Sequence, residues 1–250
     1  MENKDRHRAL FRISYIILLL AALSAFAAAS AGVGTRLGFW DFRTGFAILR
    51  FAAYGGLTAA LFSIIMFLTA LALRGPASIL AVSVLAFIIG GAVIYVPASR
   101  WRESHRVPAI HDITTDTENP PQLKAVLPLR KNAQNPSEYG GPDIAKKQQA
   151  AYPDIKPLIL PLDKDSAFEK ALRSARALGW EIVEANKGEG RIEATDKTFW
   201  FGFKDDIVVR ITPLGIGSAK IDVRSVSRVG RSDIGTNAKR IRRYLALLEK

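Results

Sequence analysis

The chain has 250 residues, of which 49% are hydrophobic, and it carries a formal net charge of +12. An even mixture of these residues would be typical of a basic globular protein such as a nucleic-acid-binding domain. The charges are segregated, however, because only 8 of the 35 Lys and Arg residues and 3 of the 23 Asp and Glu residues lie in residues 1–98. The sequence therefore predicts a membrane anchor followed by a polar domain, and it excludes nucleic acid as the expected partner.

Three runs without a charged residue, 13–35, 51–73 and 75–99, predict three transmembrane helices. A helical run of 23 residues is about 34 Å long, which exceeds the ~30 Å of bilayer hydrocarbon. Residues 1–12 form a basic N-terminal tail, and 13–99 form the three-helix anchor. The first connection is expected around Arg36, Arg43 and Arg50. Because no ionisable side chain lies inside a span, no ion or proton path is expected.

The orientation of the anchor depends on its first helix. Four basic residues precede that helix and favour a cytoplasmic N-terminus, which places the C-terminal domain on the other side: Lys4, Arg6, Arg8 and Arg12. The remaining loop charges do not decide the orientation. Alternatively, residues 1–31 form a cleaved signal peptide ending at Ala29-Ser30-Ala31. Both interpretations leave the C-terminal domain extracytoplasmic, and the absence of cysteine fits a reducing compartment without excluding a periplasm.

Residues 100–162 form a juxtamembrane segment and a proline-rich arm, since residues 107–162 hold 9 of the 12 prolines. Proline lacks a backbone donor and restricts the residue before it, so no long helix or central strand is expected here. The arm is expected to be irregular and either wrapped along the following module or partly mobile.

Residues 163–250 predict an α+β module with the order helix, antiparallel sheet, helix. The first helix is capped by Asp163 or Asp165 and ends at Gly179. The last helix carries apolar residues from Ile234 to Leu248 at spacings of three and four. Both helices are expected to cover one face of the sheet, with the arm covering an edge. Five short extended runs lie between them: 180–185, 191–195, 198–203, 207–212 and 220–227.

Two segments, GRIEATDKTFWFGFKDDIVVRI and DVRSVSRVGRSDIGTNAKRIRRYL, resemble the family known as domain of unknown function 1499. The resemblance covers about residues 108–248, and PAIHDITTDTENPP is similar to the start of the longer, multi-span members. Shorter members have a cysteine pair that this chain lacks, so a disulfide-based role is not carried over. The resemblance implies bacterial envelope or plastid relatives, supports an extracytoplasmic module and supplies no activity.

An anion-binding cluster is predicted at the end of the last strand, immediately before the final helix. It consists of Arg224, Ser225, Ser227, Arg228 and Arg231. Arginine offers a planar donor fork and helix-start amides attract negative charge, so phosphate, a lipid headgroup or a carboxylate would suit such a cluster. The alternative is structural, with Asp233 or Thr236 capping the helix and Arg224 ion-paired to Asp205, Asp206 or Asp222.

The Asp205-Asp206 pair follows the aromatic run Phe199–Phe203. Paired carboxylates can perform acid–base chemistry or bind a divalent ion. Because adjacent residues of a strand point to opposite faces, a hairpin turn with salt bridges is the expected setting. The aromatic residues are expected to form sheet core.

A second functional hypothesis is a hydrolase or metal-dependent enzyme. It would use His111 of the arm together with Asp112, Asp116, Asp205 and Asp206, since histidine and carboxylates can ligate metal or form a catalytic relay. The three histidines, His7, His105 and His111, all lie outside residues 163–250, so the arm would have to dock beside the module.

The leading hypothesis is a membrane-tethered, non-enzymatic binding or assembly module of the cell envelope that recognises an anionic group. The expected location is the bacterial inner membrane, with the C-terminal module extracytoplasmic. The bilayer is the first partner, an anionic lipid or an envelope protein is the second, and no cofactor or metal is expected.

Overall fold

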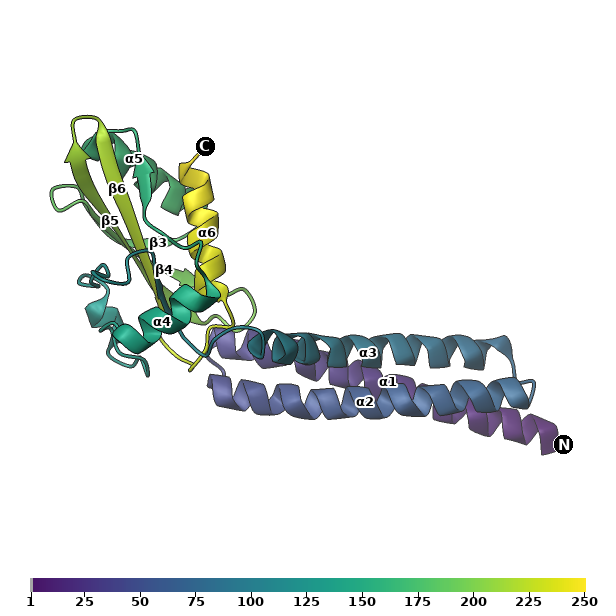
Figure 1. The fold of residues 1–250 in the computed structure, drawn as a ribbon. Helices are drawn as coiled ribbons and strands as arrows, with labels where there is room; N and C mark the ends of the chain where they lie inside the picture. The colour runs from purple at the N-terminus through teal and green to yellow at the C-terminus, as the bar shows by residue number, and fades with distance from the viewer. Residues whose placement is uncertain (1) are drawn as a thin grey trace. The chain divides into compact units, whose positions relative to one another are not determined.

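The computed structural model describes residues 2–250 and divides them into two compact units (Figure 1). One unit contains the chain up to Arg102 together with Phe199–Gly202. The other contains Glu103–Thr198 and Phe203–Lys250. The two units are described separately.

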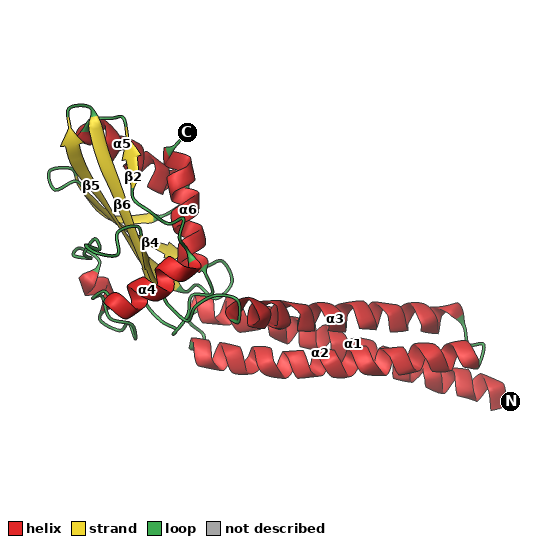
Figure 2. Cartoon of the chain, viewed as in Figure 1, coloured by secondary structure: helices red, strands yellow, loops and turns green. Residues whose placement is uncertain are grey.

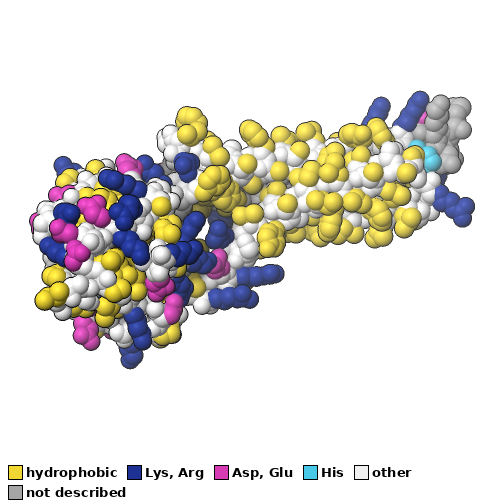
Figure 3. Space-filling view, turned by 90° about the horizontal axis from the view of Figure 1, so that it is seen from above, with side chains coloured by type: hydrophobic (Ala, Val, Ile, Leu, Met, Phe, Trp, Pro, Cys, Tyr) yellow, Lys and Arg dark blue, Asp and Glu magenta, His cyan; other side chains and the backbone are white. Residues whose placement is uncertain are grey.

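The first unit consists of three long helices, α1 (Glu2–Leu37), α2 (Phe42–Ala72) and α3 (Ala77–Ser104). All three are long and apolar enough to cross a membrane. Their outer surfaces carry exposed large apolar side chains, which appear as the yellow surface along the helices in Figure 3. Exposed hydrophobic surface of this kind is stable in lipid rather than in water, so the chain is membrane-associated.

Small residues let the membrane helices pack closely. A Cβ atom added to Gly90 of α3 would lie 2.6 Å from the backbone oxygen of Gly56 in α2, so the two backbones touch. Ala21 of α1 and Ala59 of α2 are completely buried. Close contact through Gly and Ala is typical of helix packing in membranes, where dispersion rather than the hydrophobic effect joins the helices.

The connection between α1 and α2 is shorter than the arginine positions indicate. The chain turns at Gly38, which has a φ of 79°, and Asp41 then accepts hydrogen bonds from the amides of Arg43 and Thr44. This N-cap starts α2 at Phe42. Arg43 therefore lies in the first turn of α2, and Arg50 lies in its third turn, not in the connection.

The second unit is built on an antiparallel sheet in the order β1-β6-β5-β4-β3, with β2 also paired to β6 (Figure 2). Its four main strands are β3 (Glu181–Asn186), β4 (Arg191–Lys197), β5 (Lys204–Gly215) and β6 (Ser218–Ser227). The short strands β1 (Asp112–Thr114) and β2 (Leu158–Leu160) come from the arm and pair with different parts of β6. The arm thereby covers the edge of the sheet that β6 would otherwise expose.

Two helices, α5 (Lys164–Ala177) and α6 (Thr236–Leu248), cover one face of this sheet, as the sequence predicts. Asp163 caps α5, and Gly179, with a φ of 78°, follows its end. The Tyr244 hydroxyl of α6 donates to the Ala171 oxygen of α5 at 2.9 Å, which ties the two helices together. The fold class is therefore α+β, with three membrane-type helices preceding the module.

The arm lies against the sheet. Of the two predicted alternatives, an arm wrapped along the module and a partly mobile arm, the structure has the first. It contains a ten-residue helix, α4 (Pro142–Ala151), and a 3₁₀ helix, η1 (Leu127–Arg130). The α4 helix differs from the expected irregular segment, because Pro142 occupies its first turn, where proline is tolerated. Gln148 of α4 bonds to both backbone groups of Thr114 in β1, at 3.0 and 2.6 Å. Leu123 and Val126 pack on Val208 and Val226, on the face opposite the helices.

The expected strand at 198–203 is wrong. Thr198 and Phe203 close a turn between β4 and β5, and Gly202 adopts a φ of 68°. Phe199–Gly202 belong to the helical unit, where the Trp200 indole donates to the Ala29 oxygen at 3.2 Å. The aromatic run is therefore not sheet core, because the chain has to reverse direction between two long strands at this point.

Candidate functional site

The predicted anion cluster divides between the two faces of the sheet. Side chains alternate along β6, so residues two apart share a face. Ser225 donates to Asn237 of α6 at 2.7 Å, and Asn237 donates to the Ser227 hydroxyl at 3.0 Å, so both serines lie on the helix face. Arg224 and Arg228 point to the opposite face, toward the arm. The strand geometry thus separates the arginines from the serines.

Arg224 is held by the arm. Its guanidinium donates to both carboxylate oxygens of Asp112, at 2.9 and 2.7 Å. It also donates to the backbone oxygens of Pro121 at 3.2 Å and Ser137 at 2.8 Å, and its side chain is only 2% exposed. The ion-pair partner is therefore Asp112, and the expected pairing with Asp205, Asp206 or Asp222 is wrong. The expectation failed because Asp112 is distant in sequence and is brought alongside by β1.

Asp206 forms the centre of a second buried cluster on the arm face. Its carboxylate accepts from Arg130 at 2.6 Å, from Arg228 at 2.9 and 2.7 Å, and from the Thr195 hydroxyl at 2.7 Å. Burial alone would raise the pKa of Asp206, but hydrogen bonds from Arg228, Thr195 and Arg130 outweigh burial and lower the pKa. A carboxylate held in its charged form by two arginines joins the arm to the sheet.

Asp205 points to the helix face, where the Arg240 guanidinium of α6 donates to it at 2.6 Å. Arg240 also donates to Asp196 of β4 at 2.8 Å. Asp205 and Asp206 both lie within β5 and pair with β6, so the expected hairpin turn is wrong. Their side chains leave the strand in opposite directions, and the two carboxylates do not share a site.

The remaining residues named from the sequence make separate contacts. The His111 backbone oxygen accepts from the Ser227 amide and from the Asn237 side chain, at 2.9 and 3.0 Å. Asp116 is bound by Arg210 at 3.2 Å and by Lys220 at 3.4 Å. Arg231 is exposed in the segment before α6. Within residues 2–250 no group of three or more His, Cys, Asp or Glu side chains is arranged to hold a metal ion.

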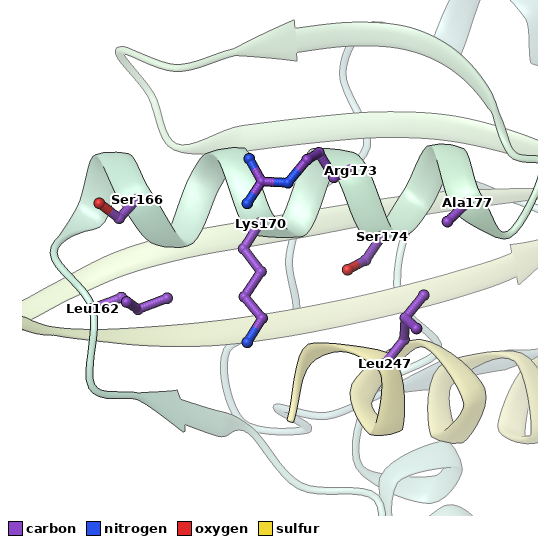
Figure 4. Close-up of a pocket in the computed structure, with 7 residues that line it drawn as sticks. All are labelled: Leu162, Ser166, Lys170, Arg173, Ser174, Ala177 and Leu247. Carbon is purple, nitrogen blue, oxygen red and sulfur yellow. The ribbon is translucent and has the colours of Figure 1, made fainter. Parts of the chain in front are cut away.

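An open groove beside α5 has features that sequence reasoning missed (Figure 4). Its volume is about 540 Å³. We call it the α5–α6 groove; its lining residues are Leu162, Ser166, Lys170, Arg173, Ser174, Ala177 and Leu247. The α5 residues recur at spacings of three and four, which places them along one side of the helix. A polar helix side normally indicates a solvated surface, so the spacing alone does not reveal a groove.

Two cations of the groove have no salt-bridge partner in the described part of the chain. The nearby acidic residues of α5, Asp165 and Glu169, both pair with Lys187, at 3.7 and 3.2 Å. Lys170 and Arg173 form no ion pair with residues 2–250, and Lys170 extends toward α6 and β2 in Figure 4. Ser174 is only 7% exposed, and its hydroxyl makes no hydrogen bond within residues 2–250. The groove therefore combines two positive charges with a serine hydroxyl that is open to a ligand.

A family model described as "Protein of unknown function (DUF1499)" matches residues 112–248. This chain belongs to the DUF1499 family. The match begins at the first residue of β1 and ends at the last residue of α6, so the DUF1499 region contains the arm, the whole sheet and both covering helices. The three membrane-type helices precede it. A comparison with curated proteins finds no match to this chain.

Proposed function

We propose that this DUF1499 protein is a membrane-tethered, non-enzymatic binding module of the cell envelope that recognises an anionic group. The observation that carries the proposal is the α5–α6 groove, where Lys170 and Arg173 lie beside the unpartnered hydroxyl of Ser174. We assign the anion site to this groove rather than to the Arg224 cluster, because Arg224 and Arg228 are already bound by buried carboxylates.

The charge of α5 supports this assignment. Helix α5 carries four basic and two acidic side chains, whereas three of the four basic side chains of α6 are already paired with carboxylates: Lys239, Arg240 and Arg242. Both acidic side chains of α5 are paired with Lys187. A surface with an excess of one charge attracts ligands of the opposite charge and repels like-charged ones.

The non-enzymatic part of the proposal is supported by the state of the carboxylates. A general base or metal ligand needs a carboxylate within reach of the reacting group or ion. Asp112 is held by Arg224, Asp205 by Arg240, and Asp206 by two arginines. Their positions on two faces of one sheet favour a structural role over a shared reaction centre.

We also propose that the protein resides in the bacterial inner membrane with its DUF1499 region outside the cytoplasm. The support is the cluster of four basic residues before the first apolar run, because basic residues accumulate on the cytoplasmic side of membrane helices.

The binding function can be tested on the full chain in nanodiscs of neutral phosphatidylcholine. We expect at least one of inorganic phosphate, glycerol 3-phosphate and oleate to raise the unfolding midpoint, since a ligand at 100 times its Kd stabilises by about 2.7 kcal/mol. We expect no turnover of carboxylic or phosphoric esters, with or without Zn²⁺ or Mg²⁺. Absence of any thermal shift would contradict the binding function. Turnover that is lost in His111→Ala would contradict the non-enzymatic assignment and support the hydrolase hypothesis.

A further inference from the structure

We infer that the α5–α6 groove binds a single acidic amphiphile, a molecule with a carboxylate or phosphate headgroup and a hydrocarbon chain. This inference deepens the proposed function by naming its ligand class and the residues that contact each part of the ligand.

The headgroup end is formed by three side chains that follow one another along α5. Lys170, Arg173 and Ser174 are separated by three and one positions, so they lie within one helical turn. An ammonium, a guanidinium and a hydroxyl together supply several donors, and charge-assisted hydrogen bonds to an oxyanion are stronger than neutral ones. The Ser174 hydroxyl lines the groove and can donate to an acceptor oxygen of a ligand bound there.

The hydrocarbon end is formed by apolar side chains beyond these donors, toward the end of α5. Ala177 ends α5, and Leu247 of α6 lies near it, while Leu162 lies at the opposite end of the groove (Figure 4). The groove has a volume of about 540 Å³ and is open to solvent. Burial of an acyl chain against these side chains removes hydrocarbon from water, which favours binding.

The membrane helices favour an amphiphile over an acidic peptide. The chain is membrane-associated, and a tether raises the effective concentration of any ligand that shares the tethered surface. Amphiphiles with acidic headgroups are components of such a surface. The groove needs only one headgroup to neutralise Lys170 and Arg173, whereas an acidic peptide would present a row of carboxylates to a site with two cations.

The chain contains no cysteine, so a single introduced cysteine reports on one position. The test uses the full chain carrying Ala177→Cys in phosphatidylcholine nanodiscs and measures the rate of maleimide labelling. We expect saturating oleate or oleoyl lysophosphatidic acid to slow labelling about fivefold, and neutral monoolein to have no effect. Ile216→Cys, in the exposed turn between β5 and β6, controls for general effects of the amphiphile on maleimide access.

Paired charge variants identify the binding residues. Protection of the cysteine introduced by Ala177→Cys should be abolished by Lys170→Gln with Arg173→Gln. The control is Lys146→Gln with Lys147→Gln, which removes two cations of α4 and should leave the protection intact. Protection in phosphatidylglycerol nanodiscs without added oleate would support the inference and identify bilayer lipid as the source. Three results would overturn the inference. They are equal protection by monoolein, protection that survives Lys170→Gln with Arg173→Gln, and protection by polyglutamate but not by oleate. If oleate fails here while phosphate still raises the unfolding midpoint, the anion-binding function stands and only the assignment of an acidic amphiphile as the ligand fails.

Discussion

At the scale of single residues, buried arginine–carboxylate pairs decide how the module is held together. Asp206 is completely buried and bonds to Arg130 from the arm and to Arg228 from the segment after β6. A buried pair of this kind contributes little net stability relative to an apolar pair, but removal of one partner leaves an uncompensated charge. Asp206 has two cationic partners, so its replacement leaves both arginines buried without their anion.

We predict that Asp206→Asn lowers the free energy of unfolding of the module by about 3–5 kcal/mol at pH 7. The side chain keeps its size and one acceptor oxygen, so the loss reports mainly on charge. Hydrogen exchange of β5 and β6 peptides in the full chain in nanodiscs measures this change. Asp165→Asn is the matched control, because Asp165 is exposed and its salt bridge to Lys187 is long at 3.7 Å. Equal exchange in the two variants would refute the structural role assigned to Asp206.

The same residue predicts how stability depends on pH. The folded-state pKa of Asp206 lies below its ordinary value of 3.8, despite the opposing effect of burial, because Arg228, Thr195 and Arg130 stabilise the charged form. A lowered carboxylate pKa gives a contribution that is present above the ordinary pKa and is lost as the pH falls below it. We therefore expect the free energy of unfolding of Asp206→Asn to fall less than that of the unaltered chain as the pH is lowered below about 4. Burial raises the pKa of Asp233, so this residue changes the pH dependence of stability in the opposite direction. Asp233 is present both in the unaltered chain and in Asp206→Asn, so its effect cancels when the two are compared.

At the scale of elements, the arm is the part whose role the structure changes most. Glu193 of β4 is completely buried and accepts from the backbone amides of Lys124 and Val126, at 2.9 to 3.0 Å. It also accepts from Arg191 of its own strand. One side chain of the sheet therefore supplies the acceptor for two backbone donors of an otherwise irregular segment, which would be costly to bury unpaired.

We predict that Glu193→Gln releases this part of the arm. The glutamine amide offers one acceptor oxygen and places its own N–H donors against the two backbone amides. Trypsin should therefore cleave after Lys124 at least about tenfold faster. A tenfold increase corresponds to about 1.4 kcal/mol of lost protection. Glu181→Gln is the control, because Glu181 is exposed and pairs with Lys197 at the surface. Unchanged cleavage in Glu193→Gln would show that the arm is held by its other contacts.

Elements with local signals could be predicted from the sequence, and those that depend on distant partners could not. The Asp163 cap, the Gly179 stop and the strand alternation in 207–212 and 220–227 all lie within a few residues of the element they define. In contrast, Arg224 forms an ion pair with Asp112, which is more than one hundred positions away. The Thr114 amide likewise donates to the side chain of Gln148, which lies in another element. The sequence pattern also shows that Lys170 and Arg173 lie on a polar helix side, but only the packing of α6 creates a groove beside them.

At the scale of the whole molecule, the chain joins a membrane-type helical unit to a DUF1499 region, and the net charge of +12 is distributed over both. Three membrane-spanning helices would place the N-terminus and the C-terminus on opposite sides of a membrane. The tail before the first span would then share one side with Arg74, between α2 and α3, and the ends of α1 and α3 would share the other. Basic residues occur on both sides, so the four-residue cluster at the N-terminus, rather than the total count, favours the cytoplasmic assignment.

We predict that a reporter fused after Lys250 is extracytoplasmic. Alkaline phosphatase, which is active only after export, should be active at Lys250 and inactive when inserted after Arg74, and a fluorescent protein that matures only in the cytoplasm should give the reverse pattern. Replacement of Lys4, Arg6, Arg8 and Arg12 by glutamine should move part of the population to the opposite orientation, because it removes the cluster that retains the N-terminus in the cytoplasm. Replacement of Lys146 and Lys147 by glutamine alters the same kind of charge far from any span and should leave the orientation unchanged. A cytoplasmic reporter at Lys250 in the unaltered chain would reverse the proposed location and assign the DUF1499 region to the cytoplasmic side.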